Sequence, residues 1–255
     1  MPHALIVEDE PEANKLLSLL VQLRGYQTQS AFNGAEALSK VEREPPDVVL
    51  LDLMLPDVNG YEVCRRIKNR KATVLIPVVI VTARVTVENR LQSYNHGADG
   101  YVAKPYTPDQ IFEALQDAER WRNALPDHFH AGSFPVCTAD EGETFRSIAR
   151  LRNILLARTP LDADAVARLA RLLEWIAARA GEWGVVQGIT ELGSLSYRVL
   201  DDRVEIRLHD TSGCFAAEYP PEVHWAAELA DAGVGRVDSD PTRREITVVR
   251  RFETA

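Results

Sequence analysis

Short apolar runs alternate with segments of helical spacing along the first half of the chain. The pattern predicts strands at residues 4–7, 27–32, 47–52, 76–81 and 100–103, and helices at residues 11–23, 34–43, 60–69, 86–96 and 108–121. Five strands that alternate with five helices predict a parallel sheet covered by helices on both faces, which is a doubly wound α/β domain.

The pattern changes after residue 122. Residues 123–144 contain Pro126, Gly132 and Pro135 together with a polar run, and these features predict a linker. The remaining chain predicts an amphipathic helical pair, one further helix and two β-hairpins, at residues 145–157, 162–180, 222–232, 195–208 and 236–249. We therefore expect an α/β domain over residues 1–122, a linker, and an α+β output domain over residues 145–255.

Composition is consistent with two domains and with a cytoplasmic location. The chain has 255 residues, and domains commonly take about 100–200. No window approaches the roughly 18 apolar residues of a membrane span, and the first ten residues do not resemble a signal peptide, so we expect no membrane contact. The three cysteines are too few for a disulfide framework and predict reduced thiols.

Net charge makes nucleic acid a disfavoured partner. The chain carries −9 in total, of which −6 falls in residues 123–255. Nucleic-acid binding draws much of its affinity from neutralising phosphates, which an acidic output domain does poorly.

Polar side chains follow the predicted strands at the points where the strands end. Glu8 and Asp9 follow the first strand, Asp52 ends the third, Thr82 ends the fourth and Lys104 follows the fifth. The carboxyl ends of doubly wound strands meet at one edge, so these side chains should converge there. Crowded carboxylates favour a hard cation such as Mg²⁺, and a carboxylate can accept a phosphoryl group as a nucleophile. Lys104 and Thr82 could then contact phosphoryl oxygens.

Five motifs stand in order along this half: Val7-Glu8-Asp9-Glu10, Leu51-Asp52-Leu53-Met54-Leu55-Pro56-Asp57, Gly60-Tyr61-Glu62, Val81-Thr82-Ala83 and Tyr101-Val102-Ala103-Lys104-Pro105. At these intervals they resemble the receiver domain of two-component response regulators, over residues 3–122. The resemblance implies a doubly wound five-stranded parallel fold.

The same resemblance implies a role for each matching residue. Asp52 would accept a phosphoryl group from a histidine kinase or phosphotransfer protein. Glu8, Asp9, Asp52 and the backbone carbonyl of Met54 would hold Mg²⁺, and Lys104 would contact the phosphoryl group.

Two further features follow from the family. Thr82 and Tyr101 would form a switch pair, in which the Thr82 hydroxyl moves to the phosphate and Tyr101 turns inward. A cis bond would precede Pro105. The only enzymatic activity implied is self-dephosphorylation.

A weaker resemblance links residues 145–255 to the histidine-kinase-type ATPase fold. Residues 203–213 are similar to its strand and Asp-x-Gly-x-Gly turn, and residues 226–250 to its last helix and closing hairpin. Trp175 stands where that family has a metal-binding Asn, and Ser212 replaces the first Gly of the turn. These departures imply a non-catalytic domain that has lost ATP binding and serves protein interaction or dimerisation. An unrelated α+β domain with two hairpins is the alternative.

A DNA-binding output is the rival interpretation. Residues 229–246 also resemble the wing of a winged helix, on which Arg243 and Arg244 could contact phosphates. The acidic balance and the additional hairpin at residues 195–208 count against it. We expect a phosphorylated regulator that forms a homodimer or binds an unknown output protein, with the helices of residues 145–180 as the dimer surface.

Overall fold

The structure is a computed structural model of the chain, and it describes residues 1–137, 141–187, 191–210, 225–240 and 242–252. The chain divides into two compact units, Met1–Leu125 and Pro126–Ala255. Within the described residues, no helix is both long enough and apolar enough to cross a bilayer.

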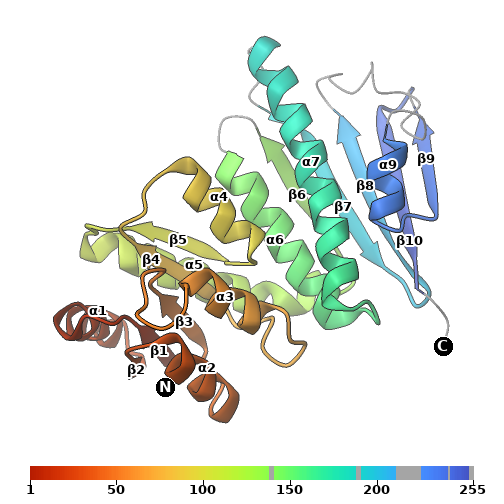
Figure 1. Cartoon of the computed structure of the whole chain (residues 1–255). Coiled ribbons are helices and arrows are strands. Elements are labelled where there is room, and N and C mark those ends of the chain that lie inside the picture. The colour runs from red at the N-terminus through yellow and green to blue at the C-terminus, as the bar shows by residue number, and fades with distance from the viewer. Residues whose placement is uncertain (138–140, 188–190, 211–224, 241, 253–255) are drawn as a thin grey trace. The chain divides into compact units, whose positions relative to one another are not determined.

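The first unit is built on a five-stranded sheet in the order β2-β1-β3-β4-β5, with every pairing parallel (Figure 1). Its strands are β1 (His3–Val7), β2 (Gln27–Ala31), β3 (Val48–Leu51), β4 (Val78–Thr82) and β5 (Gly100–Ala103). Its helices are α1 (Pro11–Leu23), α2 (Gly34–Arg43), α3 (Gly60–Lys68), α4 (Val87–Asn95) and α5 (Pro108–His128). The doubly wound α/β prediction is confirmed.

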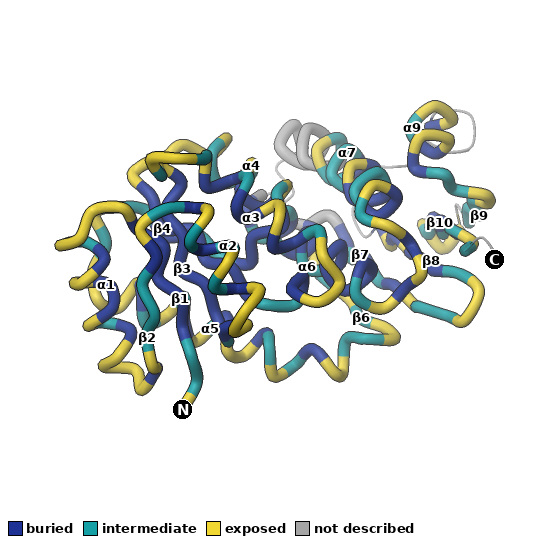
Figure 2. The backbone as a smooth tube through the Cα atoms, turned by 60° about the horizontal axis from the view of Figure 1, so that its bottom comes forward, coloured by how far each residue is buried: buried dark blue, intermediate teal, exposed yellow. Residues whose placement is uncertain are grey.

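Two apolar clusters cover the two faces of this sheet. Alternate residues of a strand point to opposite faces, and β1 accordingly gives Leu5 and Val7 to one cluster and Ala4 and Ile6 to the other. Helices α2 and α3 complete the first cluster, and α1 and α5 complete the second. Figure 2 shows the resulting pattern, with buried strands between helices whose outer sides are exposed.

The order of the strands creates a crevice. The chain passes from β1 to β2 on one side and then returns to β3 on the other side of β1. Ligands of doubly wound sheets bind outside the carboxyl ends of the strands where the order reverses in this way. The crevice therefore lies where β1 and β3 end.

The second unit is an α+β arrangement around an antiparallel sheet in the order β6-β7-β8-β10-β9. Its elements are β6 (Ala131–Cys137), α6 (Glu141–Arg158), α7 (Ala163–Gln187), β7 (Glu191–Val199), β8 (Arg203–Asp210), α9 (Ala226–Asp231), β9 (Arg236–Asp240) and β10 (Glu245–Arg251). Helices α6 and α7 pack together and contact β6 and β7 respectively (Figure 1). The expected helical pair and the hairpins β7–β8 and β9–β10 are present.

The stretch expected to be a linker, residues 123–144, is ordered secondary structure where the structure describes it. Its first six residues extend α5, β6 follows, and α6 begins at Glu141. The division into compact units falls within α5, after Leu125. The described part of the stretch expected to be a linker therefore consists mostly of helix and strand.

Tertiary pairing explains why β6 was missed. Gly132 and Pro135 argue against a strand in isolation, but β6 lies at the edge of its sheet, where a proline is tolerated. Phe134 stacks between the rings of His128 and Tyr197, with centroids 6.1 Å and 6.0 Å away. The contact with Tyr197 and the pairing with β7 come from residues distant in sequence, so local patterning does not reveal them.

Candidate functional site

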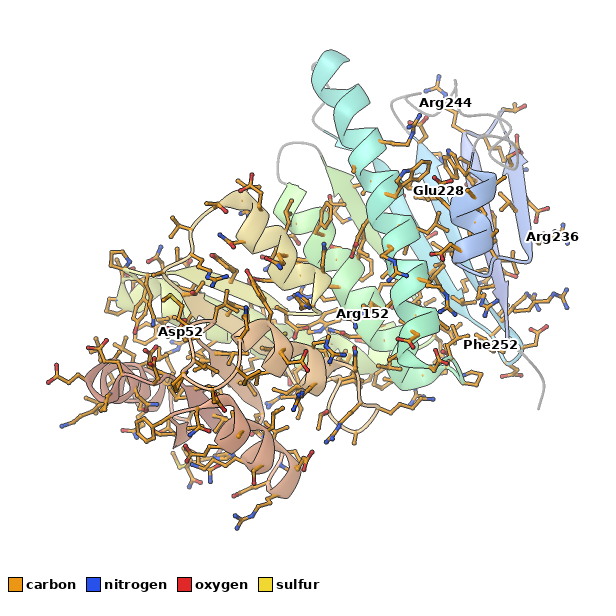
Figure 3. All side chains as sticks on the ribbon, in the orientation of Figure 1. Asp52, Arg152, Glu228, Arg236, Arg244 and Phe252 are labelled. Atoms are coloured by element: carbon orange, nitrogen blue, oxygen red, sulfur yellow. The ribbon has the colours of Figure 1, made fainter. Side chains whose placement is uncertain are left out.

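The carboxyl ends of β1 and β3 bring three carboxylates together. Glu8 and Asp9 directly follow β1, and Asp52 directly follows β3. Glu8, Asp9 and Asp52 each offer an oxygen, and these oxygens lie within 4.8 Å of one another. Glu8 and Asp52 are buried, whereas Asp9 is exposed. Figure 3 labels Asp52 within the first unit.

Lys104 supplies a positive charge to this cluster. Its ammonium nitrogen lies 2.6 Å from Glu8 Oε2 and 2.5 Å from Asp52 Oδ2. The peptide bond between Lys104 and Pro105 is cis, as the family resemblance implies. The backbone N–H of Lys104 donates to the carbonyl of Thr82 at 2.8 Å, which ties the end of β5 to the end of β4.

Burial and the contacts within the cluster shift the pKa values of Glu8 and Lys104. Burial raises the pKa of the Glu8 carboxyl; the Lys104 contact opposes this shift, and the Asp52 and Asp9 charges add to it. Burial alone would lower the pKa of the Lys104 ammonium, but its hydrogen bonds to Asp52 and Glu8 outweigh burial and raise it. The cluster therefore keeps a cation in contact with Glu8 and Asp52.

The backbone around Asp52 fixes the orientation of its carboxyl group. The N–H of Met54 donates to Asp52 Oδ1 at 3.0 Å, and the Met54 side chain is exposed. Helix α3 begins at Gly60 and approaches this loop closely: a Cβ on Gly60 would lie 2.3 Å from the Asp52 carbonyl oxygen. Any side chain there would force the backbone of this loop to shift, which gives Gly60 a structural role that the motif alone did not explain.

Two further residues fix the backbone near the site, and neither was assigned a role from the sequence. The Asn14 side chain, buried on α1, donates to the backbone carbonyl of Glu8 at 3.1 Å. The Asp57 carboxylate accepts the N–H groups of Gly34 and Ala35 at 2.8 Å and 2.9 Å, at the start of α2. The position of Asp57 in a loop rich in turn residues suggests a structural role. Its hydrogen-bond partners lie more than 20 positions away, so the sequence does not identify them.

Thr82 and Tyr101 occupy neighbouring strands. Thr82 is fully buried at the end of β4, and its hydroxyl accepts the N–H of Arg84 at 3.4 Å. Tyr101 packs against the apolar cluster that includes Tyr61, and burial is the main cause of its raised pKa. Its hydroxyl is buried without a hydrogen-bond partner among the described residues. The ring of Tyr101 is thus turned inward while its polar tip is unsatisfied.

The donor set fits a divalent cation. Mg²⁺ prefers oxygen ligands and is commonly held by one or two carboxylates with water and phosphate oxygens. Glu8, Asp9 and Asp52 present such oxygens at one edge of the sheet, and Asp9 is open to solvent. Lys104 lies beside two of these carboxylates. The arrangement can neutralise an incoming phosphoryl group while presenting a carboxylate to it.

The fold and the site define a doubly wound α/β domain with an acidic pocket at its strand ends. Residues 4–116 match the family model of the response regulator receiver domain. This segment of the chain is a response regulator receiver domain.

The curated relatives match the same half of the chain. The DNA-binding dual master transcriptional regulator RpaA of Synechocystis is 32% identical over 126 residues, which cover 49% of this chain and 52% of that protein. The transcriptional regulatory protein ResD of Bacillus subtilis is 38% identical over 129 residues, which cover 51% and 52%. The chain thus spans about half the length of the curated relatives it matches.

A solved structure covers the same region. The response regulator receiver domain protein from Methanospirillum hungatei is 27% identical, with a TM-score of 0.46, and the match covers 49% of this chain and 98% of that one.

Proposed function

We propose that this chain is a cytoplasmic two-component response regulator that accepts a phosphoryl group on Asp52 from a histidine kinase or a phosphotransfer protein. The observation that carries the proposal is the placement of Asp52: its carboxyl lies with those of Glu8 and Asp9 and 2.5 Å from the Lys104 ammonium. The match of residues 4–116 to the receiver family supports it.

The proposed reaction is an in-line transfer. A carboxylate oxygen of Asp52 attacks the phosphorus of a phosphohistidine, and a new P–O bond forms as the P–N bond breaks. The electron pair of the broken bond returns to the histidine ring of the donor, which takes up a proton. Lys104 contributes a cation next to the phosphoryl oxygens, and the Met54 N–H holds the Asp52 carboxyl in orientation.

Glu8, Asp9, Asp52 and the backbone carbonyl of Met54 are the proposed ligands of Mg²⁺. When bound, the ion would offset the negative charge of the phosphoryl group beside these carboxylates. We expect no other catalytic activity of the domain beyond self-dephosphorylation.

The proposed switch couples Thr82 to Tyr101. The Thr82 hydroxyl turns to a phosphoryl oxygen and leaves the Arg84 N–H, with which its present contact is long at 3.4 Å. The Tyr101 ring then fills the space that the Thr82 hydroxyl leaves. A local change in contacts of this kind biases the surface around β5 between two states.

For the second unit we propose a non-catalytic output that acts through protein interaction or dimerisation. The β9–β10 hairpin is part of a five-stranded sheet through β10, and α9 has six residues, which supports this proposal over a winged helix.

A degenerate histidine-kinase-type ATPase fold remains our proposal for the ancestry of this unit. A helical pair, two hairpins and a buried Asp210 at the end of β8 support it. Trp175 is half-buried on α7, at the position where that family has an Asn. The turn that would carry the missing glycine, residues 211–213, lies outside the described residues.

The test of the phosphoacceptor proposal uses the full chain, Mg²⁺ and acetyl phosphate as a small phosphoryl donor. Intact-mass spectrometry should show one added phosphoryl group, which Asp52→Asn prevents. Light scattering with beryllofluoride, a phosphoryl mimic, should then show a change in association that Asp52→Asn lacks. A mass that does not change in the presence of Mg²⁺ contradicts the proposal.

A DNA-binding output is the second candidate, and one observation favours it. The relatives are named as transcriptional regulators, and β9, β10 and the turn between them carry exposed arginines at positions 236, 243, 244 and 251; Arg236 and Arg244 are labelled in Figure 3. Binding to duplex DNA that weakens steeply with salt would support this candidate. No binding at low salt would leave protein interaction as the output.

A further inference from the structure

An open groove lies between helices α7 and α9 of the second unit. It is lined by Arg168, Arg171, Leu172, Glu174, Trp175, Ala178, Ala227, Glu228 and Asp231, and we call this set the α7–α9 groove. Its lining includes the half-buried Trp175 and two small residues, Ala178 and Ala227. The Arg179 guanidinium lies over the Trp175 ring, 5.2 Å from the ring centroid. Tryptophans are frequent anchors of protein interfaces.

Contacts at both ends of α9 hold this wall of the groove in place. Trp225 directly precedes α9 and is fully buried, and its ring meets that of Trp175 edge to face, with centroids 5.8 Å apart. Gly233 follows α9 with a positive φ of 63°, and its carbonyl accepts a hydrogen bond from Arg250 of β10. Both ends of α9 are therefore fixed, and the wall that it forms is preorganised.

The two walls carry opposite charges. Arg168 and Arg171 line the α7 side, and Glu228 and Asp231 line the α9 side. Glu228 is labelled on α9 in Figure 3. An ion pair across the groove, between Arg171 and Asp231, is long at 3.7 Å, with side chains 60% and 64% exposed. A pair of this kind stabilises little and leaves both charges accessible to other groups.

Glu174 is an acid on the basic wall. Burial raises its pKa to about 7, an effect that the charges of Arg152 and Arg171 only partly offset. Its charge near neutral pH is consequently reduced, and the α7 wall keeps a net positive charge.

These features determine which kind of segment fits. An occupant must present acidic groups to α7, basic groups to α9 and an apolar surface to Trp175. A second copy of the same groove, rotated by a two-fold axis, meets all three requirements, because its α9 faces the first α7 and its α7 faces the first α9.

We propose that the α7–α9 groove is a self-association surface whose partner is a second copy of this chain. The two grooves face each other, each acidic wall lies against the basic wall of the other copy, and the Trp175 side chains lie within the contact. This inference concerns the second unit and does not depend on the chemistry of Asp52.

Charge reversal on one wall tests the proposal in the full chain. One variant carries Arg168→Glu and Arg171→Glu, and the other carries Glu228→Arg and Asp231→Arg. Sedimentation velocity over a concentration series should show wild-type dimers, whose dissociation constant beryllofluoride changes, and monomers for each variant alone. An equal mixture of the two variants should form one-to-one heterodimers, because both contacts across the axis are then restored.

Several outcomes overturn the proposal. The proposal is overturned if the wild-type protein stays monomeric with and without beryllofluoride. It is also overturned if either charge-reversal variant still dimerises. A mixture that stays monomeric shows that the walls do not pair with each other, and would point to a different occupant. Unchanged circular dichroism spectra of the variants exclude misfolding as the cause of dissociation.

Trp175→Ala provides a second measurement that leaves the charges in place. We expect it to weaken self-association about 30-fold, since buried interface tryptophans commonly contribute at this level. Ala230→Ser, on an exposed position of α9 outside the groove, is its control. Asp52→Asn in the wild-type background separates the two proposals, because it abolishes phosphorylation and should leave the groove competent to associate.

Discussion

The ammonium nitrogen of Lys104 lies 2.5 Å from Oδ2 of Asp52, although 52 positions separate the two residues in sequence. The parallel sheet makes this contact possible, because β3 and β5 flank β4 and all three strands end at the same edge. The same ammonium group contacts Glu8, so one cation serves two of the three clustered carboxylates. Our first prediction follows from this geometry.

Lys104→Met should slow phosphorylation by acetyl phosphate about 100-fold, the usual scale for losing one electrostatic contact to a transferring group. The same variant should bind Mg²⁺ more tightly, because the three carboxylates lose their internal counter-charge. Rates come from intact-mass spectrometry and affinities from calorimetric titration. Lys15→Met, at an exposed position of α1, is the matched control. A Lys104→Met variant with the wild-type phosphorylation rate would show that Lys104 does not contribute to phosphoryl transfer.

Gly60→Ala should lower the free energy of unfolding of the receiver domain by about 1–3 kcal/mol, the typical cost of overpacking a tight contact. The added Cβ would lie 2.3 Å from the Asp52 carbonyl oxygen and 2.6 Å from Leu53 Cα, and both are backbone atoms. Urea unfolding measures the effect. Gly235→Ala is the control, since a Cβ there would meet nothing within 4 Å. Equal stability of the two variants would contradict the close approach of α3.

Lys68→Met should cost about 3–5 kcal/mol, because it leaves the buried Asp99 carboxylate without its cation. The ion pair measures 2.6 Å, with side chains 0% and 2% exposed. Lys68 also donates to the carbonyls of Val74 and Ile76, so it holds the loop before β4. The double variant Lys68→Met with Asp99→Leu should recover part of the loss in urea unfolding. A double variant as unstable as the sum of the single variants would contradict pairing.

The pH dependence of the second unit should report on Glu174. Its pKa is raised from 4.5 to about 7 by burial. Below pH 4.5 both folded and unfolded chains hold the proton and this contribution to stability is fully present. As pH rises towards 7 the unfolded chain releases the proton first, so stability is lost, by no more than about 3 kcal/mol. Glu174→Gln should flatten this part of the profile, as followed by urea unfolding at pH 5 and pH 8. An unaltered slope would contradict the raised pKa.

The receiver half was predictable because its signals are local. Apolar runs of strand length end in acids, and helices begin at caps such as Asn33 and Asn59, whose side chains accept the N–H groups of Glu36 and Tyr61. The convergence of the site residues could be predicted from one further rule, that the carboxyl ends of parallel strands lie at the same edge of the sheet. Glu8, Asp9, Asp52 and Lys104 meet for that reason.

Features set by distant contacts were not predictable in the same way. The role of Gly60 depends on how closely α3 approaches the Asp52 backbone, and the Lys68–Asp99 pair joins residues 31 positions apart. Strand β6 depends on pairing with β7, because its glycine and proline oppose a strand locally. The charge pattern of the α7–α9 groove depends on the packing of two helices that are distant in sequence, so local periodicity does not predict it.

The most direct test of the central claim identifies the residue that carries the phosphoryl group. Borohydride reduces an aspartyl phosphate to homoserine and releases inorganic phosphate, while unmodified carboxylates do not react. Chain treated with acetyl phosphate and Mg²⁺, reduced and digested, should yield homoserine at position 52 in peptide mass spectrometry. Homoserine at another aspartate, or at none in protein whose intact mass shows the added phosphoryl group, would contradict the assignment of Asp52.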